Sequence, residues 1–269
     1  MEMLILVPKI TNRLYYIFEL MLKDELGIDF KFTTDKDSYL SHEGAKLHYG
    51  KYPMPEESGL YQQAANILFE HDIADQDVKI CNYKESKAIY PVFNEKSLFP
   101  FDIFAASFYI ITRYEEYLPH VSDNYNRFQP QDSILYKMEM MERPVINLWS
   151  IDLGNELVAR YPEITLKKKT FRFVPTYDVD AAWAYRNKGF FRTTLSLCRD
   201  ILRFDKNEIK YRWDVLRKKK MDPFDTFEYQ IKLQKEKQIN KTKRAEQALF
   251  YCKFSSAFST VFLQNMHFR

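Results

Sequence analysis

The stretch FRFVPTYDVDAAWAY, residues 171–185, decides how the C-terminal half of the chain is interpreted. An alternating apolar run leads into Asp178 and Asp180, two carboxylates separated by one residue. In a strand, residues i and i+2 project from the same face, so the pattern predicts both carboxylates together at a strand end. Adjacent like charges repel unless a positive group lies beside them. The stretch therefore indicates a site for a cation.

Two interpretations of this pair remain open from its spacing. Polar residues at the carboxyl ends of strands are where α/β enzymes place their chemistry, which favours a metal-binding or acid/base role. A helix-like segment follows the pair, however, and an aspartate before a helix commonly caps it by accepting backbone N–H bonds. Asp178 or Asp180 could have that purely structural role.

The rest of the chain alternates between strand-like and helix-like patterns, so we expect a mixed α/β fold. Asp102 in the sequence Pro100-Phe101-Asp102 is the clearest predicted helix cap, and Thr11 or Asn12 is another. The patterns predict strands at 3–7, 28–33, 78–80 and 89–93, and helices at 13–26, 60–70, 102–117, 152–161, 191–203, 205–218 and 227–233.

Composition excludes several classes of protein. The chain has 269 residues but only 6 glycines, and no glycine-rich phosphate-binding loop is present. Its net charge of +3 comes from residues 232–269, which hold eight Lys and Arg against two Asp and Glu. A basic tail can bind nucleic acid, but we do not expect a nucleic-acid partner for this chain.

The cysteines and the N-terminus bear on the compartment. Cys81, Cys198 and Cys252 are scattered, with neither a disulfide framework nor a metal-type pair. The apolar run at the N-terminus is too short for a signal peptide or a membrane span. We expect a cytoplasmic protein without a membrane span, and the sequence does not fix its oligomeric state.

The segment VPTYDVD, residues 174–180, resembles the first catalytic motif of polysaccharide deacetylases, the NodB-type carbohydrate esterases. Roughly residues 1–231 are similar to a bacterial form of this family in which a domain of uncharacterised function precedes the deacetylase domain. The matching stretches are VPKITNRLYYIF (7–18), FTTDKDSY (32–39), PFDIFAASFYIITRYEEYLPH (100–120), RFQPQDS (127–133), AYRNKG (184–189) and KKKMDPFDTFEY (218–229).

The resemblance implies a distorted (β/α) barrel that hydrolyses acetyl groups on a cell-envelope saccharide. In that family a divalent metal, commonly zinc, is held by one Asp and two His, and it polarises the acetyl carbonyl and activates water. A second Asp accepts the proton of that water. By motif position, Asp178 corresponds to the base and Asp180 to the metal ligand.

The chain departs from the family pattern after this motif. Only His267 follows Asp180, in a context unlike the family's downstream histidine motif, and the later motifs are absent. A barrel of this type needs about 200 residues or more. We therefore expect an α/β domain at 1–165, an incomplete distorted (β/α) barrel at 166–236, and an aberrant basic tail at 237–269, produced by truncation or a frameshift.

Two functions follow as hypotheses. One is a deacetylase relative that does not bind zinc tightly and is inactive alone; the other is a non-catalytic carbohydrate-binding or scaffold protein built on the N-terminal domain. Two further segments each have two interpretations. Residues 113–117, RYEEY, predict either a packed amphipathic helix or the lining of a saccharide groove. Trp183, Tyr185 and Arg186 either lie at the mouth of the site or pack beneath the following helix.

Overall fold

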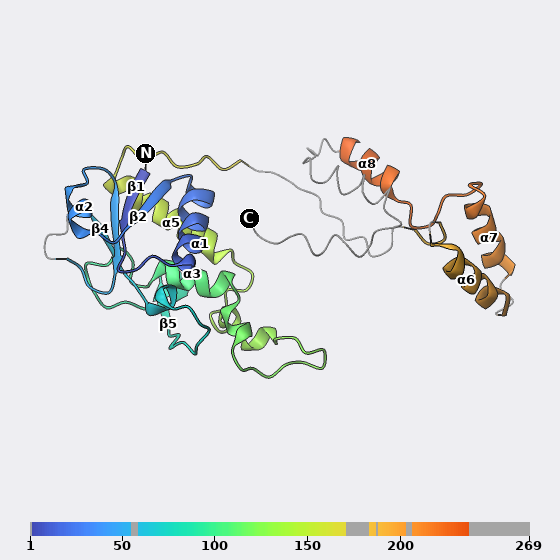
Figure 1. Cartoon of the computed structure of the whole chain (residues 1–269), viewed down its shortest axis with the longest axis horizontal. Coiled ribbons are helices and arrows are strands. Elements are labelled where there is room, and N and C mark those ends of the chain that lie inside the picture. Colours follow the sequence, from blue (N-terminus) through green and yellow to red (C-terminus); the bar gives the residue numbers. More distant parts are fainter. Residues whose placement is uncertain (1, 55–58, 171–182, 187, 203–205, 237–269) are drawn as a thin grey trace. The chain divides into compact units, whose positions relative to one another are not determined.

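The computed structural model describes residues 2–54, 59–170, 183–186, 188–202 and 206–236 (Figure 1). The chain divides into two compact units, Met1–Lys169 and Thr170–Arg269. Each unit is described by itself below.

The first unit is built on a parallel sheet with the strand order β2-β1-β3-β4. All three neighbouring pairs are parallel, with Ile5 opposite Phe32 on one side and Leu47 on the other. Parallel neighbours need crossover connections, which is why helical segments separate most of these strands in the sequence. The strands are β1 (Glu2–Leu6), β2 (Asp29–Thr33), β3 (Lys46–Gly50) and β4 (Leu60–Gln63).

Helices lie on both sides of this sheet. Figure 1 shows α1 (Asn12–Phe18), α3 (Ile103–Ile111) and α5 (Val145–Arg160) on one side and the short helix α2 (Lys36–Ser41) on the other. The predicted helix at 13–26 is confirmed, but from Glu19 to Leu26 it is a π-helix. It ends at Gly27, whose φ of 76° suits glycine, and a Cβ there would lie 2.8 Å from Lys167 Cβ.

The sequence interpretation differs from the structure at residues 36–41 and 60–70. Residues 60–70 do not form the predicted helix: they form β4 and a 3-10 turn at Asn66–Phe69. The helix α2 was missed, because its six residues are too few to show a helical period. The two later strands are β5 (Ile80–Tyr83) and β6 (Ser86–Ile89), which form an antiparallel hairpin with a tight turn at Lys84 and Glu85.

Aromatic side chains fill the core between the sheet and its helices. Phe18 of α1 stacks on Phe104 of α3 with ring centroids 3.9 Å apart, and Tyr49 of β3 meets Phe104 edge-on. Trp149 of α5 lies 5.1 Å from Phe101 and is buried. Such pairs add to the stabilisation from apolar burial itself, so α1, α3 and α5 share one continuous core.

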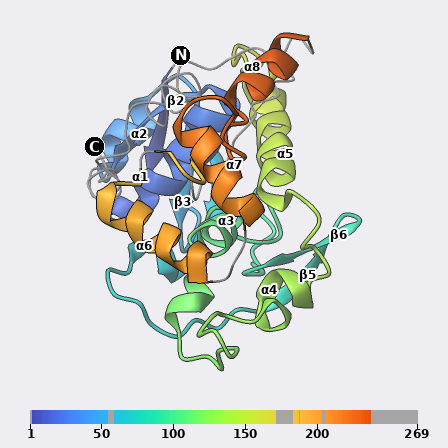
Figure 2. The same ribbon diagram turned by 90° about the vertical axis from the view of Figure 1, so that its right-hand side faces the viewer.

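The predicted cap at Asp102 is confirmed, but its helix is shorter than expected. Arg113 adopts a left-handed conformation (φ 53°), which ends α3 and starts the 3-10 turn Tyr114–Tyr117. After it come a second short turn at Pro130–Asp132 and α4 (Ile134–Lys137). Figure 2 shows α4 near the β5–β6 hairpin, and an ion pair of 3.5 Å joins Lys87 of β6 to Glu139 just beyond α4.

The second unit is helical in the part that the structure describes. Its helices are α6 (Phe190–Leu202), α7 (Lys206–Leu216) and α8 (Phe227–Glu236), so the three helices predicted in this region are confirmed. Arg212 of α7 is buried and donates to the Ser196 hydroxyl of α6 at 2.7 Å. Among the helices of both units that are described, none has the length and apolarity needed to cross a membrane.

Candidate functional site

The predicted site residues Asp178 and Asp180 lie outside the described residues. The chain that follows them is described from Trp183, only three residues after Asp180. The candidate site is therefore built from the segment 183–186 and from the groups of the second unit that hold it.

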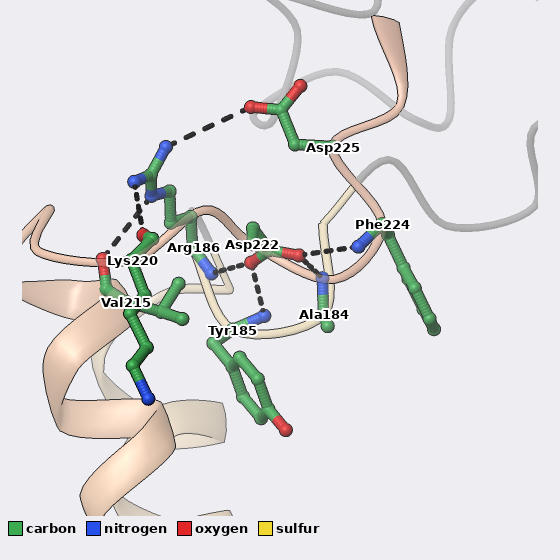
Figure 3. Close-up of polar contacts among 8 residues, drawn as sticks. All are labelled: Ala184, Tyr185, Arg186, Val215, Lys220, Asp222, Phe224 and Asp225. Carbon is green, nitrogen blue, oxygen red and sulfur yellow. Dashed lines mark hydrogen bonds and ion pairs between the residues drawn. The ribbon is translucent and has the colours of Figure 1, made fainter. Parts of the chain in front are cut away.

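One buried carboxylate holds this segment in place. Asp222, in the turn between α7 and α8, accepts hydrogen bonds from the backbone N–H groups of Ala184 (2.7 Å), Tyr185 (2.8 Å), Arg186 (3.1 Å) and Phe224 (3.1 Å), as Figure 3 shows. We call this arrangement the Asp222 clamp. It joins residues 184–186 to a turn 36 or more positions later in the sequence.

The clamp controls the charge of Asp222. Burial raises the pKa of this carboxyl, but the four backbone N–H donors outweigh burial and bring the pKa below its ordinary value of 3.8. Hydrogen bonds to a carboxylate stabilise its ionised form, so Asp222 is ionised at neutral pH. The site therefore has a negative charge at Asp222, and each of its two oxygens already accepts two backbone hydrogen bonds.

Arg186 extends the clamp to the end of α7. Its guanidinium donates to the carbonyl oxygens of Lys220 (3.2 Å) and Val215 (3.4 Å), and it lies 4.0 Å from Asp225 Oδ2 (Figure 3). The second oxygen of Asp225, Oδ1, is buried and has no hydrogen-bond partner among the residues that the structure describes. Arg186 thus closes the turn after α7 mainly through carbonyl groups, and Asp225 contributes only a long ionic contact.

The neighbouring aromatic residues pack within the unit. Tyr185 donates its hydroxyl to Glu208 of α7, and the Arg212 guanidinium carbon lies 4.7 Å from the centre of its ring. Burial and the Glu208 hydrogen bond raise the pKa of Tyr185 to about 12. Trp183 meets Phe227 edge-on with centroids 6.0 Å apart. These contacts favour packing of Trp183, Tyr185 and Arg186 within the unit, but against α7, the turn after it and α8 rather than beneath the following helix, α6.

No metal centre is assembled by the residues that the structure describes. In 2–54, 59–170, 183–186, 188–202 and 206–236, no three His, Cys, Asp or Glu side chains could hold a metal ion together. His48 lies on β3 and is buried beside Tyr61, whereas His71 Nε2 lies 2.7 Å from Lys9 Nζ in an exposed contact. His48 thus contacts a tyrosine ring and His71 a lysine, and neither contact is with a further metal-ligating side chain.

The first unit has its own buried carboxylate and its own pocket. Asp102 at the start of α3 is completely buried and accepts a hydrogen bond of 2.7 Å from the Tyr49 hydroxyl. In the RYEEY segment Tyr114 is buried and Arg113 pairs with Glu116, which favours packing over a saccharide groove. A pocket of about 390 Å³ lies elsewhere, between the β5–β6 turn and the start of α5.

The sequence did not indicate that the buried carboxylates of Asp102 and Asp222, or the pocket, form sites. Asp222 was named only as part of the matching stretch 218–229. The sequence Asp-Pro-Phe-Asp at 222–225 indicates a turn before a helix, but it does not show which backbone groups Asp222 binds. Asp102 was predicted as a cap, but its bond to Tyr49 depends on a pairing across 53 residues. The pocket residues show no sequence pattern at all, because their proximity arises only when the hairpin packs on α5.

Comparison with known families identifies the first unit. A family model described as a family of unknown function, DUF7033, matches residues 3–162. No curated protein and no solved structure matches the chain. Because the matched residues make up more than half of the sequence, the chain belongs to the DUF7033 family.

Proposed function

We propose that this chain is a relative of metal-dependent polysaccharide deacetylases in which a DUF7033 domain precedes the first catalytic motif. Asp178 has the position of the base and Asp180 that of the metal ligand. The substrate class is an acetylated saccharide. In this chain the motif is one part of a site, and we propose that the chain alone does not hydrolyse acetyl groups.

The Asp222 clamp is the observation that supports the proposal best. It connects two stretches that carry the resemblance, residues 184–189 and residues 218–229, through four hydrogen bonds to one carboxylate. Ala184 is four residues after Asp180, a length of chain of at most about 14 Å. The clamp therefore fixes the backbone close in sequence to the proposed ligand, as a site that depends on positioning requires.

The described residues do not fit a catalytic zinc ion. Such a site needs about three protein ligands and one open position, and the described part of the chain offers no three suitable side chains together. Beyond Asp180, the sequence contains one histidine, His267. We therefore propose no catalytic step through a metal for this chain.

Acetate release tests the proposal directly. Acetylated chitooligosaccharides are incubated with the full chain and added zinc or cobalt, and no acetate above the protein-free control is expected. The variants Asp178→Asn and Asp180→Asn are compared with Asp37→Asn, an exposed aspartate of α2. Turnover that disappears in Asp178→Asn but survives in Asp37→Asn would contradict the proposed inactivity.

Saccharide binding separates this proposal from the non-catalytic alternative. If the full chain binds the same oligosaccharides and binding is unchanged in Asp178→Asn and Asp180→Asn, the DUF7033 domain is a carbohydrate-binding module and the motif has no part in recognition. If the two substitutions weaken binding, the motif contributes to the saccharide site.

A further inference from the structure

The pocket of the first unit is lined by two types of surface. Its volume is about 390 Å³, within the usual range of small-molecule sites. The β5–β6 turn supplies charged and polar groups, and the start of α5 supplies mainly apolar ones. The lining residues are Tyr83, Lys84, Glu85, Ser86, Met140, Arg143, Val145, Leu148, Trp149, Ile151 and Asp152.

Two charges of the pocket neutralise each other. Asp152 accepts the Tyr83 hydroxyl through Oδ2 at 2.9 Å and pairs with Lys84 Nζ through Oδ1 at 2.5 Å. Burial and the bond to Asp152 raise the pKa of Tyr83, so its hydroxyl remains a donor. Both oxygens of Asp152 are therefore used, and this triad ties the hairpin turn to α5.

Two other charges of the pocket are uncommitted. Arg143 and Glu85 are exposed, and in the described part of the chain neither side chain has a hydrogen-bond or ion-pair partner. Arg143 lies in the turn just before α5, and Glu85 lies in the hairpin turn; both line the pocket. A guanidinium binds a carboxylate with two parallel hydrogen bonds, and a carboxylate binds an ammonium group, so these two side chains can bind the two charged groups of a zwitterion.

The remaining wall is apolar and partly open. Leu148 and Ile151 of α5 are 40% and 48% exposed, and buried Met140 and Val145 continue the surface inward. The aromatic residues of the lining are not available for stacking, since Tyr83 and Trp149 are 7% and 2% exposed. An aliphatic group therefore fits this wall better than a sugar ring, which is commonly bound by an open aromatic face.

We propose that this pocket binds a zwitterion with an aliphatic side chain, namely an apolar amino acid or a peptide of two or three such residues. Arg143 binds the carboxylate, Glu85 binds the ammonium group, and Leu148 and Ile151 contact the side chain. This site lies in the DUF7033 domain and is independent of the proposed deacetylase relationship.

Calorimetric titration of the full chain with leucine, dileucine and trileucine tests the proposal and selects the ligand length. We expect binding of at least one of them at concentrations below about 10 mM, with 4-methylpentanoate and 3-methylbutylamine binding about tenfold or more weakly, because each retains only one of the two charges. Arg143→Gln and Glu85→Gln should each weaken the best ligand about tenfold as well.

Matched controls separate recognition from folding. Lys96→Gln and Glu95→Gln remove one exposed charge of each sign outside the pocket, and binding should remain unchanged. Thermal melting shows whether a pocket variant is folded, and Arg143→Lys should retain part of the affinity. Absence of binding by all three ligands, unchanged binding in Arg143→Gln and Glu85→Gln, or equal binding of the single-charge probes would overturn the proposal. Tighter binding of chitooligosaccharides at the same residues would also overturn it.

Discussion

Each unit of this protein contains a buried aspartate that accepts four hydrogen bonds, yet the two have opposite pKa shifts. Asp102 in the first unit receives the Tyr49 hydroxyl and the N–H groups of Ala65, Phe104 and Ala105. Asp222 in the second unit receives four backbone N–H groups. Burial raises the pKa of Asp102 to about 6, whereas the pKa of Asp222 is lowered from 3.8.

The difference lies in the material around each carboxylate. The exposed fractions, 0% for Asp102 and 2% for Asp222, hardly differ. Asp102 borders the aromatic core that Phe104 and Tyr49 share with Phe18, so the cost of desolvation outweighs its donors. Asp222 lies in a turn between two short helices, where similar donors outweigh desolvation. The number of hydrogen bonds therefore does not predict the pKa of a buried aspartate; the desolvation by the surrounding groups must be included.

The largest expected effect is the loss of the Asp102 carboxylate. Asp102→Ala leaves three backbone N–H groups and the Tyr49 hydroxyl without their acceptor, which should lower the free energy of unfolding of the first unit by about 3–4 kcal/mol. Hydrogen exchange of α3 amides in the full chain measures this loss. Asp35→Ala at the exposed cap of α2 is the control, with about 1 kcal/mol expected. Equal losses would refute the role assigned to burial.

The second prediction concerns pH. Because the pKa of Asp102 is about 6 in the folded protein and near 3.8 when unfolded, the folded state holds its proton more strongly. The stability contributed by this group is complete below about pH 4 and is lost as pH rises through 6, by about 3 kcal/mol in total. Urea unfolding between pH 4.5 and 7 should show that the free energy of unfolding of the wild type falls with rising pH relative to that of Asp102→Asn. A difference independent of pH would contradict the raised pKa.

Asp222 should show the opposite pH dependence. Since its folded pKa is below 3.8, its stabilisation is present above the unfolded pKa and is lost as the pH falls through the folded value. At pH 7, Asp222→Ala should cost the second unit about 2 kcal/mol and speed hydrogen exchange at 184–186. Asp225→Asn is a matched control three residues away, because in the described part of the chain Asp225 Oδ1 has no hydrogen bond and Oδ2 makes only the 4.0 Å contact with Arg186. A larger effect from Asp225→Asn would rule out the clamp.

The smallest effect should come from removing one donor. Tyr49→Phe leaves the packing against Phe18 and Phe104 intact but deletes the hydroxyl that donates to Asp102. We expect a loss of about 1.5 kcal/mol and a further rise in the pKa of Asp102, because its ionised form loses a donor. Repeating the pH series in Tyr49→Phe would detect the rise. An unchanged midpoint would mean that the hydroxyl does not influence the charge of Asp102.

The sequence predicted those elements whose signals are local. Thr11 or Asn12 was predicted to cap the first helix, and Thr11 does so; Asp102 was predicted to cap α3 and does so, because caps depend on neighbouring residues. Residues 60–70 failed for the opposite reason. Leu60, Tyr61 and Gln62 become a strand because β3 lies alongside them, and that pairing is invisible to a helical period.

The candidate site was only partly within reach of the sequence. The sequence shows the pair Asp178 and Asp180 directly, because the two residues lie in one short contiguous stretch, but their role as a deacetylase motif stays a prediction. The sequence does not show the contact between Asp222 and the N–H groups of 184–186, since a backbone donor has no residue identity that a sequence could reveal. The sequence also gives no sign that Arg143 and Glu85 line one pocket, because segments 58 positions apart come together there only in the folded unit.

By itself, the sequence determined the α/β class and the helix cap at Asp102, since each depends on neighbouring residues. The resemblance of residues 174–180 to a deacetylase motif stays a prediction. Tertiary structure alone decided the strand order β2-β1-β3-β4, the depth that separates Asp102 from Asp222, and the union of a hairpin turn with α5 into one pocket. These properties arise from contacts between distant segments, and desolvation depends on everything packed around a group rather than on its neighbours in the chain.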